Sequence, residues 1–422
     1  MKRIAALIML CAVLFLPLCS CTDAREINSW AHAYIIGVDK GVADKLRFTI
    51  LIPTLQQGGQ GGGSGGMGQS PQSEGETAVI SIDCPTLFSG LNQMDSFLSR
   101  RVNYTHAEMF VIGEELAKQG ITPFMEGMRM AREVRLDMNV VVVKGQAGDF
   151  IESFDPVLGE SVPGVLEGLI FTQELSGLTD QVTYLEMLQD LKSVSKQASC
   201  ALGAVNDFSN YLPPGSDGTH IEVTELTAGE IARKGGNPIE LLGTAVFRGD
   251  KLVGQLNVKE TRSLLMIKGE FIIGSVTMHD PLDSESYITT QLVQEKSPQV
   301  RVSLDGEIPV IDIKLFLEGS IQNQQSEFMY QTPELKPVLE KACAQFVADG
   351  IAGVVSKCQS LGCDIFGFGK KAASNFYTIR EWESFGWGDK FKEAEVNIEV
   401  CVKIMRTGII VEYNPIQKEG GK

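Results

Sequence analysis

The start of the chain is the sequence feature that most limits where the rest of the protein can be located and fold. It places basic residues, an apolar run and a cysteine in a fixed order. Lys2 and Arg3 are basic, and the 13 residues 4–16 form an apolar run. As a helix, such a run is too short to span the roughly 30 Å of hydrocarbon in a bilayer. Residues 1–20 therefore predict a signal peptide, which directs the remaining chain out of the cytoplasm.

The apolar run leads into Leu18-Cys19-Ser20-Cys21, which resembles a bacterial lipobox. In that motif a leucine three positions before the cysteine and a small residue directly before it position the sulfur for lipid transfer. Cys21 is therefore the predicted lipidation site, where acyl chains such as palmitate are attached, and Cys19 fits less well because Leu18 precedes it. An ordinary secretory signal with incidental cysteines is the alternative.

The mature chain is strongly acidic. Loss of residues 1–20 removes two positive charges, so that the formal charge changes from −16 to −18. This balance argues against nucleic acid as a partner, and it gives the whole body no electrostatic attraction to anionic lipid. The membrane contact is therefore expected through the lipid anchor on Cys21, for which two acyl chains suffice.

Six cysteines remain after the anchor: Cys84, Cys200, Cys343, Cys358, Cys363 and Cys401. Cys343 and Cys358 lie on one predicted helix, about 22 Å apart at 1.5 Å per residue, whereas a disulfide requires Cα atoms within roughly 7 Å. Cys358 and Cys363 flank Gly362 and remain able to meet. There is no Cys-x-x-Cys pair and the four histidines are scattered, so we predict neither a metal site nor a cofactor.

Residues 21–205 predict an N-terminal α+β region of one or two subdomains. Alternating apolar residues at 46–52 predict a strand, and residues 77–82 predict a second. Between them, the glycine-rich residues 56–76 predict a surface loop rather than a phosphate-binding loop, because no Gly-Lys-Ser/Thr follows them.

Two apolar runs in the same region, residues 109–112 and 139–143, predict strands that are buried on both faces. Helical spacing dominates residues 148–195. Residues 206–238 contain Pro213-Pro214-Gly215 and Gly235-Gly236, which predict a linker with a short connecting strand and a domain boundary.

Residues 239–413 predict a C-terminal α+β domain, followed by a tail at 414–422. Gly249-Asp250 separates two apolar runs and predicts a hairpin turn. A helix is expected at 259–268, and a long helix is expected to begin at Thr332-Pro333. With the alternating runs before and after that helix, the fold class is α+β with two to three domains, mainly antiparallel sheets and packed helices.

The search for catalytic motifs finds none. The sequence has no Gly-x-Ser-x-Gly elbow, His-Glu-x-x-His motif, Walker loop or dinucleotide fingerprint. We therefore predict a protein that is not an enzyme, with no catalytic or cofactor-binding residues. Ligand-binding residues remain unassigned.

Several blocks of the sequence together resemble one family, Ger(x)C, the lipoprotein C subunit of nutrient germinant receptors of spore-forming bacteria. The first pair of blocks is Cys21-Thr-Asp-Ala-Arg-Glu-Ile27 and Ile36-Gly-Val-Asp-Lys40, although Thr22 stands where the family usually has tryptophan. The other blocks are Arg100-Arg101, His106 and Val111-Ile-Gly-Glu-Glu-Leu-Ala117; Gly243-Thr-Ala-Val-Phe-Arg-Gly-Asp-Lys-Leu-Val-Gly254 with Glu260-Thr-Arg262; and Asp364-Ile-Phe-Gly-Phe-Gly369 with Trp382, Trp387, Phe391 and Arg406-Thr-Gly408.

The resemblance implies a non-catalytic receptor subunit. Such proteins resemble three-domain α+β bodies on the outer face of the spore's inner membrane, where they work beside an A and a B membrane subunit. The expected role is receptor assembly or signal coupling, which leads to ion and dipicolinate release during germination.

Two other classes share the anchor. A solute-binding lipoprotein of a transporter is the main alternative, and it should consist of two similar α/β lobes joined by a hinge. A lipoprotein hydrolase is the third class, and it would require turnover that one side-chain replacement abolishes.

Overall fold

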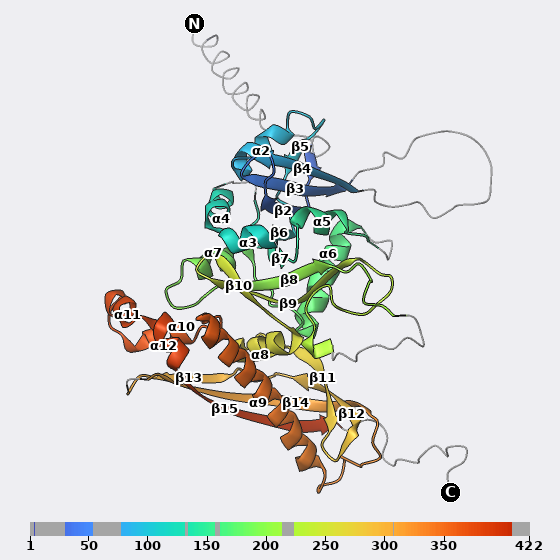
Figure 1. The fold of residues 1–422 in the computed structure, drawn as a ribbon, viewed down its shortest axis with the longest axis vertical. Helices are drawn as coiled ribbons and strands as arrows, with labels where there is room; N and C mark the ends of the chain where they lie inside the picture. The colour runs from blue at the N-terminus through green and yellow to red at the C-terminus, as the bar shows by residue number, and fades with distance from the viewer. Residues whose placement is uncertain are drawn as a thin grey trace, which may run out of the picture.

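The computed structural model describes Ile4 and residues 30–53, 77–130, 134–156, 161–212, 223–306 and 308–406. Cys21, all of the signal peptide except Ile4, the glycine-rich residues 56–76 and the tail 414–422 lie outside these residues. The described chain forms two bodies, each built on its own large sheet, with the first body above the second in Figure 1.

The first body contains an eight-stranded mixed sheet in the order β10-β9-β8-β7-β6-β2-β3-β4. Its centre is parallel, because β2, β6, β7 and β8 run in the same direction, and its two sides are antiparallel. The strands are β2 (Ile35–Lys40), β3 (Leu46–Pro53), β4 (Thr77–Cys84), β6 (Met109–Gly113), β7 (Asn139–Val143), β8 (Ser199–Val205), β9 (Ile239–Arg248) and β10 (Lys251–Leu256).

Helices cover both faces of this sheet. Phe110 and Ile112 of β6 belong to one hydrophobic core, whereas the alternate residues Met109 and Val111 belong to another. The first core is closed by α2 (Leu87–Met94), α3 (Glu114–Gln119), α4 (Thr122–Arg129) and α7 (Tyr184–Leu191), and the second by α5 (Ala147–Glu152) and α6 (Val162–Ser176). Burial on both faces confirms the prediction from the apolar runs at 109–112 and 139–143.

A two-stranded parallel sheet lies at the upper end of the first body, beside α2 (Figure 1). It pairs β1 (Trp30–His32) with β5 (Arg101–Asn103). The described chain therefore enters the first body at this end.

The second body is a five-stranded sheet around one long strand, β14 (Val310–Gln324). One edge of β14 pairs in parallel with β15 (Glu395–Arg406), and the other edge pairs antiparallel with β12 (Asp283–Val293) and β13 (Gln299–Ser303). The strand β11 (Ile273–Asp280) extends the sheet beyond β12.

Helices cover one face of the second sheet. The 26-residue helix α9 (Lys336–Leu361) and helix α8 (Val258–Lys268) lie over it in Figure 1, and Leu339, Ile351 and Val354 of α9 are fully buried. The opposite face carries polar side chains, among them Arg301, Asp312 and Lys314. The remaining short helices are η3 (Val223–Glu225), α10 (Phe368–Ala372), η4 (Ala373–Asn375), α11 (Ile379–Phe385) and α12 (Trp387–Glu393).

The α+β class is confirmed, but three details differ from the sequence predictions. The centre of the first sheet is parallel. Strand β9 pairs with β8, and β10 pairs with β9, so residues 239–256, which open the predicted C-terminal domain, extend the sheet of the first body. The long helix begins at Lys336, after a turn in which Thr332 accepts a hydrogen bond from the Leu335 amide.

In the part of the chain that the structure describes, the helices fall short of the length and hydropathy needed to cross a membrane.

Candidate functional site

The described residues contain no cluster of histidine, cysteine, aspartate and glutamate able to hold a metal ion. All six described cysteines are free, and five of them are buried. Burial raises the pKa of Cys343 and of Cys363 to about 11, which leaves little thiolate at neutral pH. These thiols are therefore core residues rather than nucleophiles.

Asp39, from the block Ile36-Gly-Val-Asp-Lys40, joins β2 to helix α5. Its carboxylate accepts hydrogen bonds from the amides of Ala147 (2.8 Å) and Gly148 (2.9 Å) at the start of that helix. Burial raises the pKa of Asp39, and the two amide donors oppose that shift. The residue fixes the position of α5 on the sheet.

The β9–β10 hairpin lies where the two bodies meet. Gly249 adopts the left-handed conformation that the turn requires (φ 59°), and its amide donates to Gln197 Oε1 at 2.7 Å. The carbonyl of Asp250 accepts from the Ile121 amide, and Arg248 donates to the carbonyl of Leu361, the last residue of α9. The predicted turn is confirmed, and it links both bodies.

Helix α8 adds a buried ion pair to this joint. Lys268 Nζ lies 2.6 Å from Asp180 Oδ1, with side chains that are 7% and 0% exposed. Ser199 also donates to Asp180. Burial disfavours both charges, yet Lys268 and Ser199 together lower the pKa of Asp180, while Asp180 and Glu270 raise that of Lys268. The pair thus ties α8 to the first body.

Arg262, also on α8, forms a second link between the bodies. Its guanidinium donates to the carbonyls of Ser275 in β11 (2.7 Å) and Ser176 at the end of α6 (3.3 Å). Cations are favourable at a helix C-terminus, although burial lowers the pKa of Arg262 to about 10. This arginine of the Glu260-Thr-Arg262 block therefore connects β11 of the second body to the end of α6 in the first body.

Asp364 organises the block Asp364-Ile-Phe-Gly-Phe-Gly369. Its carboxylate accepts hydrogen bonds from four backbone amides and from Trp387 Nε1 (2.9 Å); the amide donors are Phe366, Gly367, Phe368 and Gly369. Burial raises the pKa of Asp364, and these donors oppose the shift. Gly369 is required because a Cβ there would collide with the Ser195 carbonyl and the Trp387 ring.

A shallow groove follows the same joint, between the β9–β10 hairpin and helices α11 and α12. Its lining mixes charges of both signs with two indole rings: Arg248, Lys392, Glu383, Asp389, Trp382 and Trp387. The tryptophan rings lie 5.9 Å apart and their side chains are buried. The lining offers no set of convergent donors or acceptors for a cofactor.

The sequence identified the blocks but missed most of the partners within the joint. Asp180 and Lys268 are 88 residues apart, and no local pattern connects them. Asp39 is a buried residue near the end of strand β2. His32 and His106 meet with ring centroids 4.7 Å apart. The predicted lipidation site, Cys21, lies outside the described residues, so it stays a prediction.

Comparison of the sequence with protein families places the chain in one class, the spore germination proteins. Residues 23–202 match the family model described as "Spore germination protein N-terminal domain", and residues 242–408 match "Spore germination B3/ GerAC like, C-terminal". The chain belongs to the Ger(x)C family.

Two relatives match this chain in sequence over nearly its whole length. The chain is 25% identical to spore germination protein KC of Bacillus subtilis (strain 168), covering 99% of this chain and 98% of that protein. It is 23% identical to the spore germination protein YfkR of the same organism, covering 93% and 94%. The crystal structure of the GerBC protein aligns with a TM-score of 0.47 and 14% identity, covering 88% of this chain and 96% of that one.

Proposed function

We propose that this protein is the membrane-anchored, non-catalytic lipoprotein subunit of a spore nutrient germinant receptor. It acts beside the A and B membrane subunits in receptor assembly or signal coupling, on the outer face of the spore's inner membrane. The observation that carries the proposal is the match of both spore germination models in order along one chain, behind a lipobox at Cys21.

The use of the family blocks supports a structural role. Asp39, Arg248, Arg262 and Asp364 all hold elements together through backbone groups. Because these side chains are committed to internal contacts, they are unsuited to turning over a substrate.

The two bodies also differ from the lobes of a solute-binding protein. The first is a mixed sheet covered on both faces, and the second is a sheet covered on one. A solute-binding lipoprotein has two similar lobes around a ligand cleft. Equilibrium dialysis of the protein with amino acids and sugars tests this alternative, which tight binding of one such solute would favour.

Deletion of the gene in its spore-forming host tests the main proposal. Purified spores should lose the fall in optical density that nutrients cause, and they should retain the response to a trigger that bypasses nutrient receptors. Complementation with the wild-type gene should restore the nutrient response. An unchanged nutrient response in a strain without paralogues would contradict the receptor role.

A Cys21→Ala variant tests the anchor. Without acyl chains, the protein should leave the membrane fraction upon salt and carbonate washing, because its acidic body has no electrostatic attraction to lipid. Cys19→Ala is the matched control and should remain in the membrane. Retention of the Cys21→Ala protein after washing would contradict the lipid anchor.

A further inference from the structure

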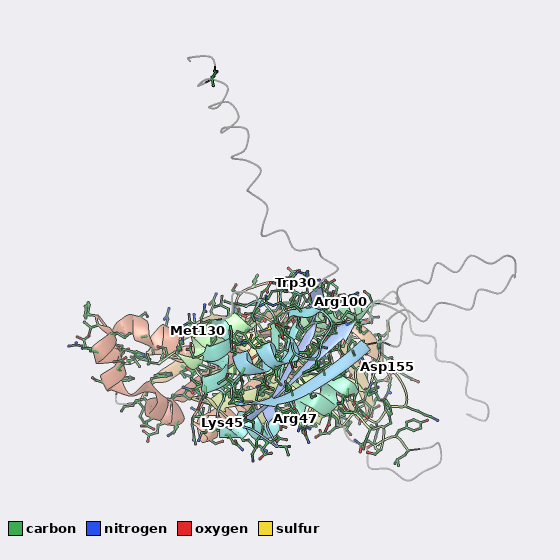
Figure 2. All side chains as sticks on the ribbon, turned by 90° about the horizontal axis from the view of Figure 1, so that it is seen from above. Trp30, Lys45, Arg47, Arg100, Met130 and Asp155 are labelled. Carbon is green, nitrogen blue, oxygen red and sulfur yellow. The ribbon has the colours of Figure 1, made fainter. Side chains whose placement is uncertain are left out.

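The end of the first body where the chain enters bears large aromatic side chains next to arginines. We define the anchor end by Trp30 of β1, Phe88 of α2, Phe97 of the following turn, Arg100 and Arg101. The pairing of β1 with β5 puts Trp30 opposite Arg101, and helix α2, which carries Phe88, contacts β5. Figure 2 looks down on this end and labels Trp30 and Arg100 close to each other.

Two phenylalanine side chains of the anchor end are more than half exposed. Phe97 is 56% exposed and Phe88 is 51% exposed, and Trp30 is half-buried. The Arg101 guanidinium lies over the Trp30 ring, 5.8 Å from its centroid. Tryptophan and other aromatic rings with arginine are typical of the water–lipid interface, where an apolar ring and a polar tip are both accommodated.

The local charge also differs from the rest of the chain. Residues 87–104 contain two arginines and one carboxylate, Asp95, in a chain with 53 acidic and 37 basic side chains. Asp95 pairs with Arg101 at 3.6 Å, while Arg100 is exposed beside it. The anchor end is therefore suited to phosphate groups, unlike the acidic body as a whole.

The length of the chain before Trp30 limits how far this end can lie from a bilayer. Nine residue steps separate Cys21 from Trp30, and at full extension they span at most about 30 Å. If Cys21 carries the lipid, the anchor end is the part of the described chain nearest to the bilayer.

From these observations we propose that the anchor end binds the phospholipid headgroup layer directly. Trp30, Phe88 and Phe97 place their rings at headgroup depth, and Arg100 binds lipid phosphates. The body is then oriented on the membrane instead of moving freely on its tether. This inference rests on the lipid anchor of the proposed function, and it adds an orientation that the anchor alone does not supply.

Tryptophan fluorescence offers a direct test, because the chain has three tryptophans and two of them are buried. Trp382 and Trp387 are each 4% exposed, so quenching by lipid should report on Trp30. The mature lipidated protein is reconstituted into phosphatidylglycerol–phosphatidylethanolamine vesicles whose acyl chains are brominated near the headgroup. We expect partial quenching in the wild type and its loss in Trp30→Phe.

A double variant separates binding from mere tethering. Phe97→Ser with Arg100→Glu should reduce the quenching at least about twofold, because it removes a ring and inverts a charge at the contact. The matched control is Arg301→Glu, on the exposed face of the second sheet, which should leave the quenching unchanged. No quenching in the wild type, or equal quenching in the double variant, would overturn the proposal.

A second arrangement keeps this result independent of lipidation. The mature chain, with Cys21 replaced by a hexahistidine tag, is held on vesicles that contain nickel-chelating lipid. Quenching of Trp30 there supports the contact even if native lipidation fails, and its absence overturns the contact even if the germination role holds.

Discussion

The two large sheets of this protein differ in how many of their faces are buried. Consecutive residues of β6 point into two separate cores, since Met109 and Phe110 are both fully buried on opposite faces. In β14 only every second residue is buried: Ile313 is 1% exposed, while Asp312 and Lys314 face outward. Lys314 pairs there with Glu399 of β15 at 2.6 Å.

Because of this difference, the two sheets need different amounts of helical cover in order to fold. The first sheet can form only when helices from several parts of the chain cover it on both sides. The second sheet is covered on one face only, mainly by α9 and α8, and leaves its other face to water. Substitutions at neighbouring positions should therefore have different consequences in the two bodies.

The largest effect is expected at the joint, where the two bodies would be uncoupled. Lys268→Met leaves the Asp180 carboxylate buried without its partner, which typically costs about 3–5 kcal/mol. We expect urea unfolding followed by circular dichroism to show a lower midpoint and two separate transitions.

The double variant Asp180→Asn with Lys268→Met is the control for the joint. It removes both charges, so it should recover most of the lost stability. If the single and double variants unfold alike, the ion pair does not couple the bodies.

The next effect contrasts the faces of the two sheets. Met109→Ala and Ile112→Ala should each cost about 2–5 kcal/mol, because both residues fill a core. Ile313→Ala in β14 should cost a similar amount, whereas Lys314→Ala should stay within about 0.5 kcal/mol, as is usual for a surface position. Denaturant midpoints of the four variants measure the contrast. A large cost at Lys314 would show that the outer face of the second sheet is covered.

The smallest effect concerns the edge of the first sheet. Arg47 and the amides of Ala43 and Val42 hold the pKa of Asp83 at about 2, below the value of about 3.9 for an unfolded chain. The stabilisation is complete above pH 4 and is lost as the pH falls towards 2. Asp83→Asn should therefore flatten the acid limb of a stability–pH curve.

The control for the acid limb is Asp305→Asn, an exposed position before β14 in the second body. It changes the net charge equally and takes no part in the hydrogen bonds of Asp83. The acid limb should keep the wild-type slope in this variant, and an equal flattening in both variants would mean that net charge, not the Asp83 contacts, determines it.

Local patterns in the sequence predicted the local structure well. The β9–β10 turn at Gly249, the helix α8 and the buried strands β6 and β7 follow from spacing within a few residues. The parallel centre of the first sheet did not follow, because β2 meets β6 only after about 70 intervening residues fold into a hairpin and a helix. The Asp180–Lys268 pair was missed for the same reason.

The candidate site was predicted only as blocks of sequence. The sequence identified the block around Asp364. It did not predict that the Asp364 carboxylate accepts a hydrogen bond from Trp387 of helix α12. The hairpin signal at Gly249 does not specify which sheet the two strands join, and in the structure β9 and β10 extend the sheet of the first body. Which strands pair with each other depends on the tertiary fold, so a single sequence predicts the partners poorly.

The parallel pairing of β14 with β15 has a consequence for the order in which the second sheet can be completed. Val402 and Ile404 of β15 are buried in the second core, and β15 is the last strand of the described chain. Until it arrives, β14 exposes the backbone of one edge along residues 310–320. The second sheet is therefore complete only when the end of the described chain is in place, whereas all strands of the first sheet lie before residue 257.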